Sequence, residues 1–296
     1  MGVGTLPQKS AETQQGYRKP QKAPWHGWWE IIPIVFGIIW FIIAFYPVLY
    51  MFMTSLRPLT DFFTDVPWLP PTHPTLTNYS SVLSGDFSLA FVNTVFVTVI
   101  SVFLIVIVSL FSSYSISRIH NRFTQVVFSL FLIGLAIPLQ ATIIPIYAII
   151  INLHLYDTLF ALILPSVAFG IPLSVLVLVT YIRDIPKELY ESMLLDGAGH
   201  FRILRSLVLP LSRPAIITVV IYETIQVWNS FLFPLVLTQS SNVRVLPLAL
   251  WTFQGQYTTN VPAIMAAVFL SATPIILLYI FGRRQLLGGL IAGFSK

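Results

Sequence analysis

The chain has 296 residues, of which 56% are hydrophobic and 9% are charged, and its formal net charge is +5. Soluble globular domains carry about 25% charged residues, so this composition excludes a soluble protein and indicates a polytopic membrane protein. The sequence has no cysteine, which excludes a disulfide scaffold, an iron–sulfur site and a thiolate zinc site.

Long uncharged runs predict the membrane spans, because a membrane helix needs about 20 apolar residues. The predicted spans cover about 31–53, 90–114, 124–149, 158–182, 214–238 and 262–282. We therefore expect an all-α integral membrane protein of six transmembrane helices, with kinks where prolines fall inside them. The polar residues 1–28 are predicted to be a disordered cytoplasmic tail, and residues 29–296 form the transmembrane domain.

The basic residues predict the orientation of these spans. Of the 16 Lys and Arg residues, 14 lie in the N-terminal tail, the C-terminal tail and alternate connecting segments. Cytoplasmic segments carry such an excess, so both termini are predicted to be cytoplasmic. The positive charge is thus a sign of topology, and a nucleic-acid-binding patch is the weaker alternative.

Residues 183–213, between spans 4 and 5, contain nine of the 27 charged residues. Their pattern predicts a helical hairpin: Asp184 caps a helix with Pro186 in its first turn. Gly197 then ends that helix, and a second short helix runs from Phe201 to Leu209. Such a hairpin either docks on a protein or lies on lipid headgroups. The mixed signs of charge favour a protein partner, because anionic lipid repels carboxylates.

Within this loop, residues 191–198 read Glu-Ser-Met-Leu-Leu-Asp-Gly-Ala, and residues 207–214 read Leu-Val-Leu-Pro-Leu-Ser-Arg-Pro. They resemble the cytoplasmic "EAA" coupling loop that marks permease subunits of binding-protein-dependent ABC importers. The family pattern is Glu-Ala-Ala-x-x-Asp-Gly-Ala, followed by Leu-Pro-Leu-x-x-Pro. Ser192 and Met193 stand where the family usually has two alanines, which allow close packing against the ATPase.

Two further stretches are similar to the carbohydrate-type permeases, in particular to the second of the two six-span permease subunits of maltose and oligosaccharide importers. Residues 228–237 read Trp-Asn-Ser-Phe-Leu-Phe-Pro-Leu-Val-Leu, and residues 289–296 read Gly-Leu-Ile-Ala-Gly-Phe-Ser-Lys. The resemblance implies a multi-pass protein of a prokaryotic inner, or cytoplasmic, membrane. It forms a pathway for a sugar or oligosaccharide.

The resemblance also implies partners. They are a homologous second permease, two ATP-binding subunits, an external solute-binding protein and membrane lipid, with no nucleic acid. The ATP and Mg²⁺ belong to the ATP-binding subunits, because this chain lacks the Gly-x-x-x-x-Gly-Lys-Ser/Thr phosphate loop. We expect no cofactor, no metal and no catalytic residue on this chain. The residues that the resemblance assigns to ATPase coupling are Glu188, Glu191, Ser192, Met193, Asp196, Gly197 and Ala198. Of these, Asp196 is expected to cap the second short helix.

Polar side chains inside the spans are candidates for the substrate pathway. Glu223, Gln226 and Asn229 lie three residues apart in span 5, next to Tyr222, and Gln140 lies in span 3. The candidate lining residues are Tyr222, Gln226, Asn229 and Gln140, because amides hydrogen-bond sugar hydroxyls and aromatic rings stack on sugar faces. The alternative is hydrogen bonding to a neighbouring helix. A charge near mid-bilayer is costly, so Glu223 is expected to face protein or water.

The external stretch 239–261 resembles the loop that contacts the solute-binding protein in relatives. The candidate contact residues are Phe253, Gln254, Gly255, Gln256 and Tyr257. The alternative is an aromatic belt at the membrane interface, which accounts for the tyrosine but not for the glutamines.

Two other classes of protein are weighed against an importer subunit. A proton-coupled secondary transporter would use Glu223 as its proton carrier, but such transporters are usually built from internal repeats, which this chain does not show. A membrane-embedded enzyme lacks support, because the five histidines are scattered and no nucleophile-elbow motif occurs. The scarcity of basic residues along the pathway favours an uncharged sugar.

Overall fold

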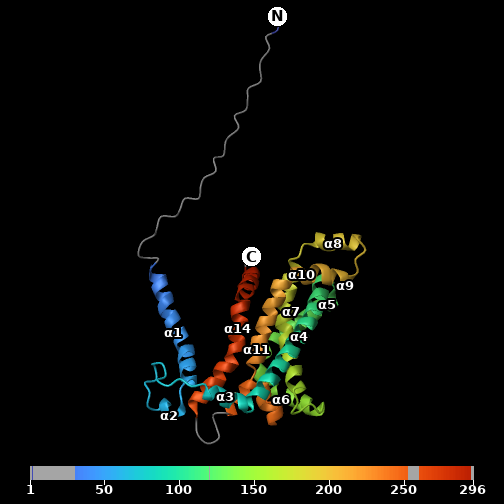
Figure 1. Ribbon diagram of the computed structural model, residues 1–296. Coiled ribbons are helices and arrows are strands. Elements are labelled where there is room, and N and C mark those ends of the chain that lie inside the picture. The colour runs from blue at the N-terminus through green and yellow to red at the C-terminus, as the bar shows by residue number, and fades with distance from the viewer. Residues whose placement is uncertain (1, 3–30, 120, 253–259, 295–296) are drawn as a thin grey trace. The chain divides into compact units, whose positions relative to one another are not determined.

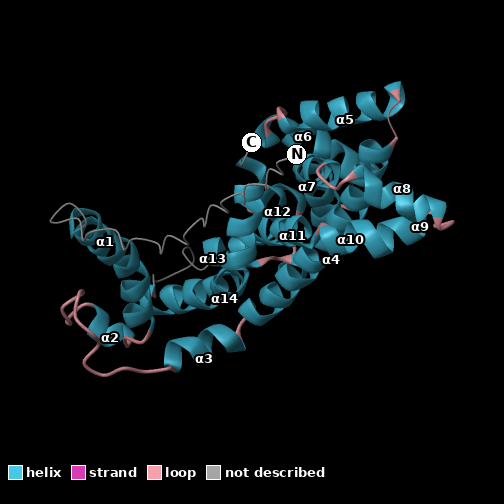
Figure 2. Ribbon diagram, turned by 90° about the horizontal axis from the view of Figure 1, so that it is seen from above, coloured by secondary structure: helices cyan, strands magenta, loops and turns pink. Residues whose placement is uncertain are grey.

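The computed structural model describes residues 2, 31–119, 121–252 and 260–294, and these residues contain helices and loops but no β-strand (Figures 1 and 2). The chain divides into two units, residues 1–49 and 50–296. The first unit contains most of α1 (Ile31–Ser55), an apolar helix of 25 residues, which is long enough to cross a membrane.

The second unit is a helical bundle. Its long helices, α4, α7, α11 and α14, run side by side (Figure 1). Along the chain the elements are α2 (Leu59–Phe62), α3 (Thr77–Ser84), α4 (Phe87–Arg118), α5 (Arg122–Leu135), α6 (Leu139–Asn152), α7 (Phe160–Arg183), α8 (Lys187–Leu195) and α9 (His200–Ile203). They continue with a π-helical turn (Leu204–Val208), α10 (Leu209–Leu211), α11 (Arg213–Trp228), α12 (Leu232–Leu237), a 3-10 turn (Ser241–Val243), α13 (Leu246–Thr252) and α14 (Val261–Phe294).

Small polar residues of α4 are buried in the bundle, and one of them bonds to α7. Ser101, Ser109 and Ser113 are fully buried on α4, and the Ser113 hydroxyl donates a hydrogen bond to the Val175 carbonyl of α7 at 3.3 Å. Without a hydrophobic driving force between helices in lipid, small side chains that let backbones approach are the usual basis of helix association. The α4–α7 pair therefore forms the centre of the bundle.

The predicted spans correspond to helices, and two of them, the third and the fifth, are interrupted. Among the described residues, four helices are long and apolar enough to cross a membrane, and the number of candidate spans is up to six if each of two bent helix pairs is counted as one span. The kink expected in the third predicted span is a sharp bend, at which α5 and α6 meet at an angle of 108°. Pro138 precedes α6, and a proline removes a backbone N–H and disfavours helical geometry in the residue before it.

The predicted fifth span is also divided. α11 ends at Trp228, and α12 begins at Leu232. At its other end α11 meets the segment His200–Leu211 at 75°. These bends place the hairpin α8–α10 across one end of the bundle, the end at which α14 finishes (Figure 1).

Candidate functional site

The turn between α8 and α9 is a Schellman motif. Gly197 has a left-handed backbone with φ of +73°, which confirms its predicted role as a helix stop. Its N–H donates to the Leu194 carbonyl at 3.0 Å, and the Ala198 N–H donates to the Met193 carbonyl at 2.9 Å. Both bonds satisfy carbonyls at the end of α8. Ala198 is buried and Met193 is half-buried in the hairpin core. The Asp-Gly-Ala sequence therefore ends α8, and its alanine packs in that core.

Three details of the predicted hairpin are wrong. Asp184 is the C-cap of α7, and the N-cap of α8 is Pro186, which has no side-chain capping bond. Asp196 does not cap the second short helix, because the N-cap of that helix is Gly199, three residues further along the chain. The second helix does not end at Leu209, as predicted, but continues through Pro210 to Leu211. The π-helical turn before it pairs the Leu209 N–H with the Leu204 carbonyl, and this wider turn accommodates the proline.

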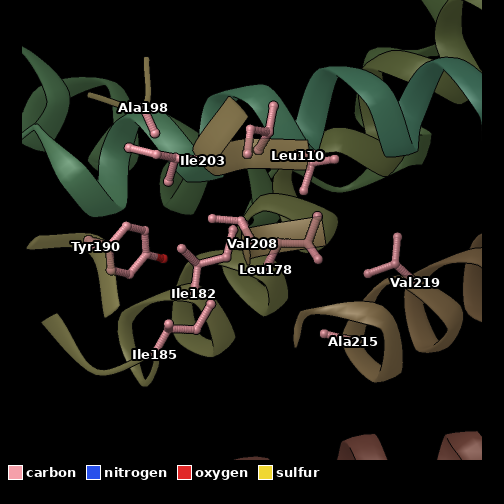
Figure 3. Packing of buried hydrophobic residues seen from close by; sticks show 11 residues of the cluster. Leu110, Leu178, Ile182, Ile185, Tyr190, Ala198, Ile203, Val208, Ala215 and Val219 are labelled. Atoms are coloured by element: carbon pink, nitrogen blue, oxygen red, sulfur yellow. The ribbon is translucent and has the colours of Figure 1, made fainter. Parts of the chain in front are cut away.

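The two faces of α8 have different surroundings. Tyr190 is 1% exposed and packs in the cluster beneath the hairpin (Figure 3). The predicted coupling residues Glu188, Glu191, Ser192, Asp196 and Gly197 are exposed. Met193 and Ala198 face the core instead, so they support the hairpin and offer little surface to a partner.

Exposed apolar side chains accompany the exposed charges, and the sequence analysis missed them. Leu195 is 89% exposed, Phe201 is 69% exposed and Leu194 is 54% exposed. A sequence signal for Leu195 was available, since it lies five residues after Tyr190 and so falls off the buried face of a helix. Large apolar groups exposed around a charged helix are typical of a surface that binds protein.

A second feature is a cavity of about 330 Å³ lined by α7, α11 and α12, with Leu135 and Leu139 from the junction of α5 and α6. Tyr222 and Gln226 line it, as predicted, and the Gln226 amide donates to the Tyr222 hydroxyl at 2.7 Å. The remaining wall contains aromatic and hydroxyl side chains that the sequence analysis missed, namely Phe169, Phe231, Phe233, Ser166 and Ser230. They come from two separate segments of the chain, so their meeting has no signal in a single sequence.

Glu223 lies at the edge of this cavity and is 3% exposed. Its carboxylate accepts a hydrogen bond from the Ser174 hydroxyl of α7 at 3.1 Å. Gly170 makes room for it, since a Cβ atom there would lie 2.8 Å from Glu223 Oε2 and 2.4 Å from Ile105 Cδ1. Glu223 therefore faces protein, as expected, and links α11 to α7.

The other two candidate pathway residues do not line the cavity. Asn229 is the C-cap of α11, and its amide donates to the Ile225 carbonyl of its own helix at 2.8 Å. Gln140 lies at an exposed position of α6, just after the sharp bend between α5 and α6. Only Tyr222 and Gln226, of the four candidates, meet at this cavity within the part of the chain that the structure describes.

At the end of the bundle opposite the hairpin, polar side chains hold the segment 239–246. Asp157 accepts hydrogen bonds from the backbone N–H groups of Gln239 and Ser240 at 2.7 and 2.9 Å, and from the Ser240 hydroxyl. The Ser240 hydroxyl, followed by these two N–H groups, lowers the pKa of the Asp157 carboxyl. Asn93 donates to the carbonyls of Asn242 and Arg244 at 2.8 and 3.0 Å.

This anchored segment leads into α13 and toward the predicted contact loop for a solute-binding protein. The five candidates of that loop, Phe253, Gln254, Gly255, Gln256 and Tyr257, lie outside the described residues. Within the described residues, no group of three or more metal-ligating side chains is placed to hold a metal ion.

The comparisons with known proteins decide the family. Residues 106–286 match the model of the family described as "Binding-protein-dependent transport system inner membrane component". The chain belongs to this family. The match includes α7, the hairpin, α11 and most of α14, and it confirms the family suggested by the coupling-loop sequence. The chain is thus a multi-pass permease subunit of an ABC importer, and the secondary-transporter alternative is not favoured.

Individual relatives are similar in sequence to this chain over most of its length. The ABC transporter permease protein ORF2 of Caldicellulosiruptor sp. (strain Rt8B.4) is 42% identical, over 88% of this chain and 95% of the relative. The starch degradation products transport system permease protein AmyC of Thermoanaerobacterium thermosulfurigenes is 30% identical, over 89% of this chain and 94% of the relative.

A solved structure has the same fold. It is a bacterial ABC transporter involved in the import of the acidic polysaccharide alginate. The match has a TM-score of 0.77 and 21% identity, over 86% of this chain and 95% of that one.

Proposed function

We propose that this permease imports a saccharide with energy supplied by separate ATP-binding subunits that dock on α8. The exposed face of α8 carries the proposal, because it combines Glu188 and Glu191 with Leu194 and Leu195. A helix that offers both apolar contact and charge fits a groove on a partner protein. ATP and Mg²⁺ are bound by those subunits, and their closure moves the docked hairpin between two rigid-body arrangements.

The cavity supports a saccharide as the substrate. Its wall offers the aromatic rings of Phe169, Tyr222 and Phe233 with the amide of Gln226, which suit the apolar faces and hydroxyl groups of a sugar ring. The name of the relative AmyC, a permease for starch degradation products, points to the same class. An external solute-binding protein delivers the saccharide, and a homologous second permease completes the pathway.

The predicted topology completes the proposal. We place the hairpin and both termini in the cytoplasm of a prokaryote, with residues 1–28 as a cytoplasmic tail. The end of α14 at the hairpin's side of the bundle (Figure 1) supports this placement for the C-terminus.

A charge on the apolar part of α8 tests the docking. We expect Leu195→Asp to remove the ATP-binding subunits from the purified complex, because burial of a carboxylate in an apolar contact is costly. The second permease stays bound. Leu69→Asp is the matched control, since Leu69 is also an exposed leucine but lies in the loop between α2 and α3.

The complex is to be purified through a tag on this chain, and its subunits identified by mass. Retention of the ATP-binding subunits by Leu195→Asp would contradict the docking on this face.

A further inference from the structure

One contact between the hairpin and the end of α4 is made by an aromatic ring. Arg118 is the last residue of α4, and its guanidinium carbon lies 3.4 Å from the centroid of the Tyr190 ring. Tyr190 is the buried residue of α8. A cation above a ring that is removed from water is a strong form of this contact, so the pair joins the hairpin to a membrane helix.

A second contact lies one helical turn away. Tyr114 of α4 and His200 of α9 approach with the Tyr114 hydroxyl 3.2 Å from His200 Nδ1. Their rings form an edge-on pair with centroids 6.3 Å apart. Residues 114 and 118 share one face of α4, and this face therefore contacts both short helices of the hairpin, α8 through Arg118 and α9 through Tyr114.

The ring of Tyr190, and not its hydroxyl, makes the contact. Among the described residues the buried Tyr190 hydroxyl has no hydrogen-bond partner. Burial raises the pKa of this phenol, against the opposing effect of the Arg118 charge. The ring stays neutral and projects from α8 toward Ile182 in the core (Figure 3).

The two polar contacts orient the hairpin on α4, which apolar packing alone does not do. The side chains around Tyr190, among them Ile182, Ile203 and Val208, are aliphatic, and dispersion between such groups has little directional preference. A planar guanidinium over a ring, together with a hydroxyl–imidazole contact, fixes both the position and the rotation of the hairpin on α4.

We propose that Arg118 and Tyr190, supported by Tyr114 and His200, form a strut that makes α8 and α4 move as one body. This inference rests on the proposed docking of the ATP-binding subunits on α8. The strut carries the displacement of the docked helix to α4, which packs along α7 and whose Ser113 hydroxyl donates to the Val175 carbonyl of α7. These four residues are positioning residues, since they act through the hairpin and touch neither ATP nor substrate.

Spin labels test the strut directly, because the chain has no native cysteine. Ser115→Cys on α4 and Lys187→Cys on α8 place labels at two exposed positions. Distances between the labels are measured in the assembled importer, without nucleotide and after trapping with ATP, Mg²⁺ and vanadate. We expect the same narrow distribution in both states.

Two variants remove the strut, and a third is the matched control. Tyr190→Leu removes the ring but keeps an apolar side chain, and Arg118→Gln removes the cation without opening the hairpin core. Both are expected to broaden the distribution and to shift it on trapping. Tyr190→Phe loses only the unpaired hydroxyl and is expected to match the wild type.

Unchanged distributions in both strut variants would overturn the proposal. A wild-type distance that changes on trapping would do the same. Absence of the ATP-binding subunits from the wild-type complex would contradict the docking instead, and the nucleotide-free distances still test the strut in that case. If Tyr190→Leu fails to assemble, Arg118→Gln decides the result.

Discussion

At the scale of single residues, Gly197 shows why the coupling-loop motif contains glycine. Its φ of +73° is a left-handed conformation, and no atom within 4 Å blocks a side chain at this position. The requirement for glycine is therefore conformational and not steric. A residue with a Cβ atom pays about 1–2 kcal/mol in this region.

We expect Gly197→Ser to destabilise the hairpin by about 1–2 kcal/mol through this backbone strain. The same change at Gly199 is the matched control, because Gly199 is an N-cap with a negative φ and open space around it. Serine is favoured at such a position. Hydrogen exchange of the hairpin amides measures the difference, and equal exchange in the two variants would show that the left-handed turn is not needed.

At the scale of elements, the polar side chains predicted for span 5 take two different roles on α11. Gln226 and Tyr222 are one turn apart and both line the cavity, whereas Asn229 closes the helix end. Sequence spacing placed all three on the same candidate pathway. It could not distinguish them, because the outcome depends on where α11 stops and on the approach of α7.

The cavity predicts a specific effect of Gln226→Leu. Loss of one hydrogen bond to a sugar hydroxyl costs about 1 kcal/mol, or about fivefold in affinity. We expect saccharide uptake to have a KM raised by about this factor, with assembly unchanged. Gln140→Leu is the control, because it makes the same change at an exposed position of α6 whose side chain does not line the cavity.

Uptake of the labelled saccharide bound by the partner solute-binding protein measures both variants. An unchanged KM in Gln226→Leu, or an equal increase in Gln140→Leu, would contradict a role of this cavity in the pathway.

At the scale of the whole molecule, the sequence predicted the helical spans and the charged hairpin because both follow from charge and hydropathy along the chain. A kink was expected in the third predicted span, and Pro138 stands at the bend between α5 and α6, but the sharpness of this bend was not predicted. Prolines also occur inside helices that continue, such as Pro165 and Pro172 in α7, and the apolar run shows no interruption. The Arg118–Tyr190 contact joins distant segments, and no local pattern reveals it.

The central claim is that this chain works as the permease of an importer whose ATPase and solute-binding protein are separate chains. Affinity purification from the native membrane, with the bound subunits identified by mass, tests this claim most directly. We expect a second permease, an ATP-binding subunit and, after mild cross-linking, an external binding protein. A chain that purifies alone and still supports uptake of saccharide would contradict the claim.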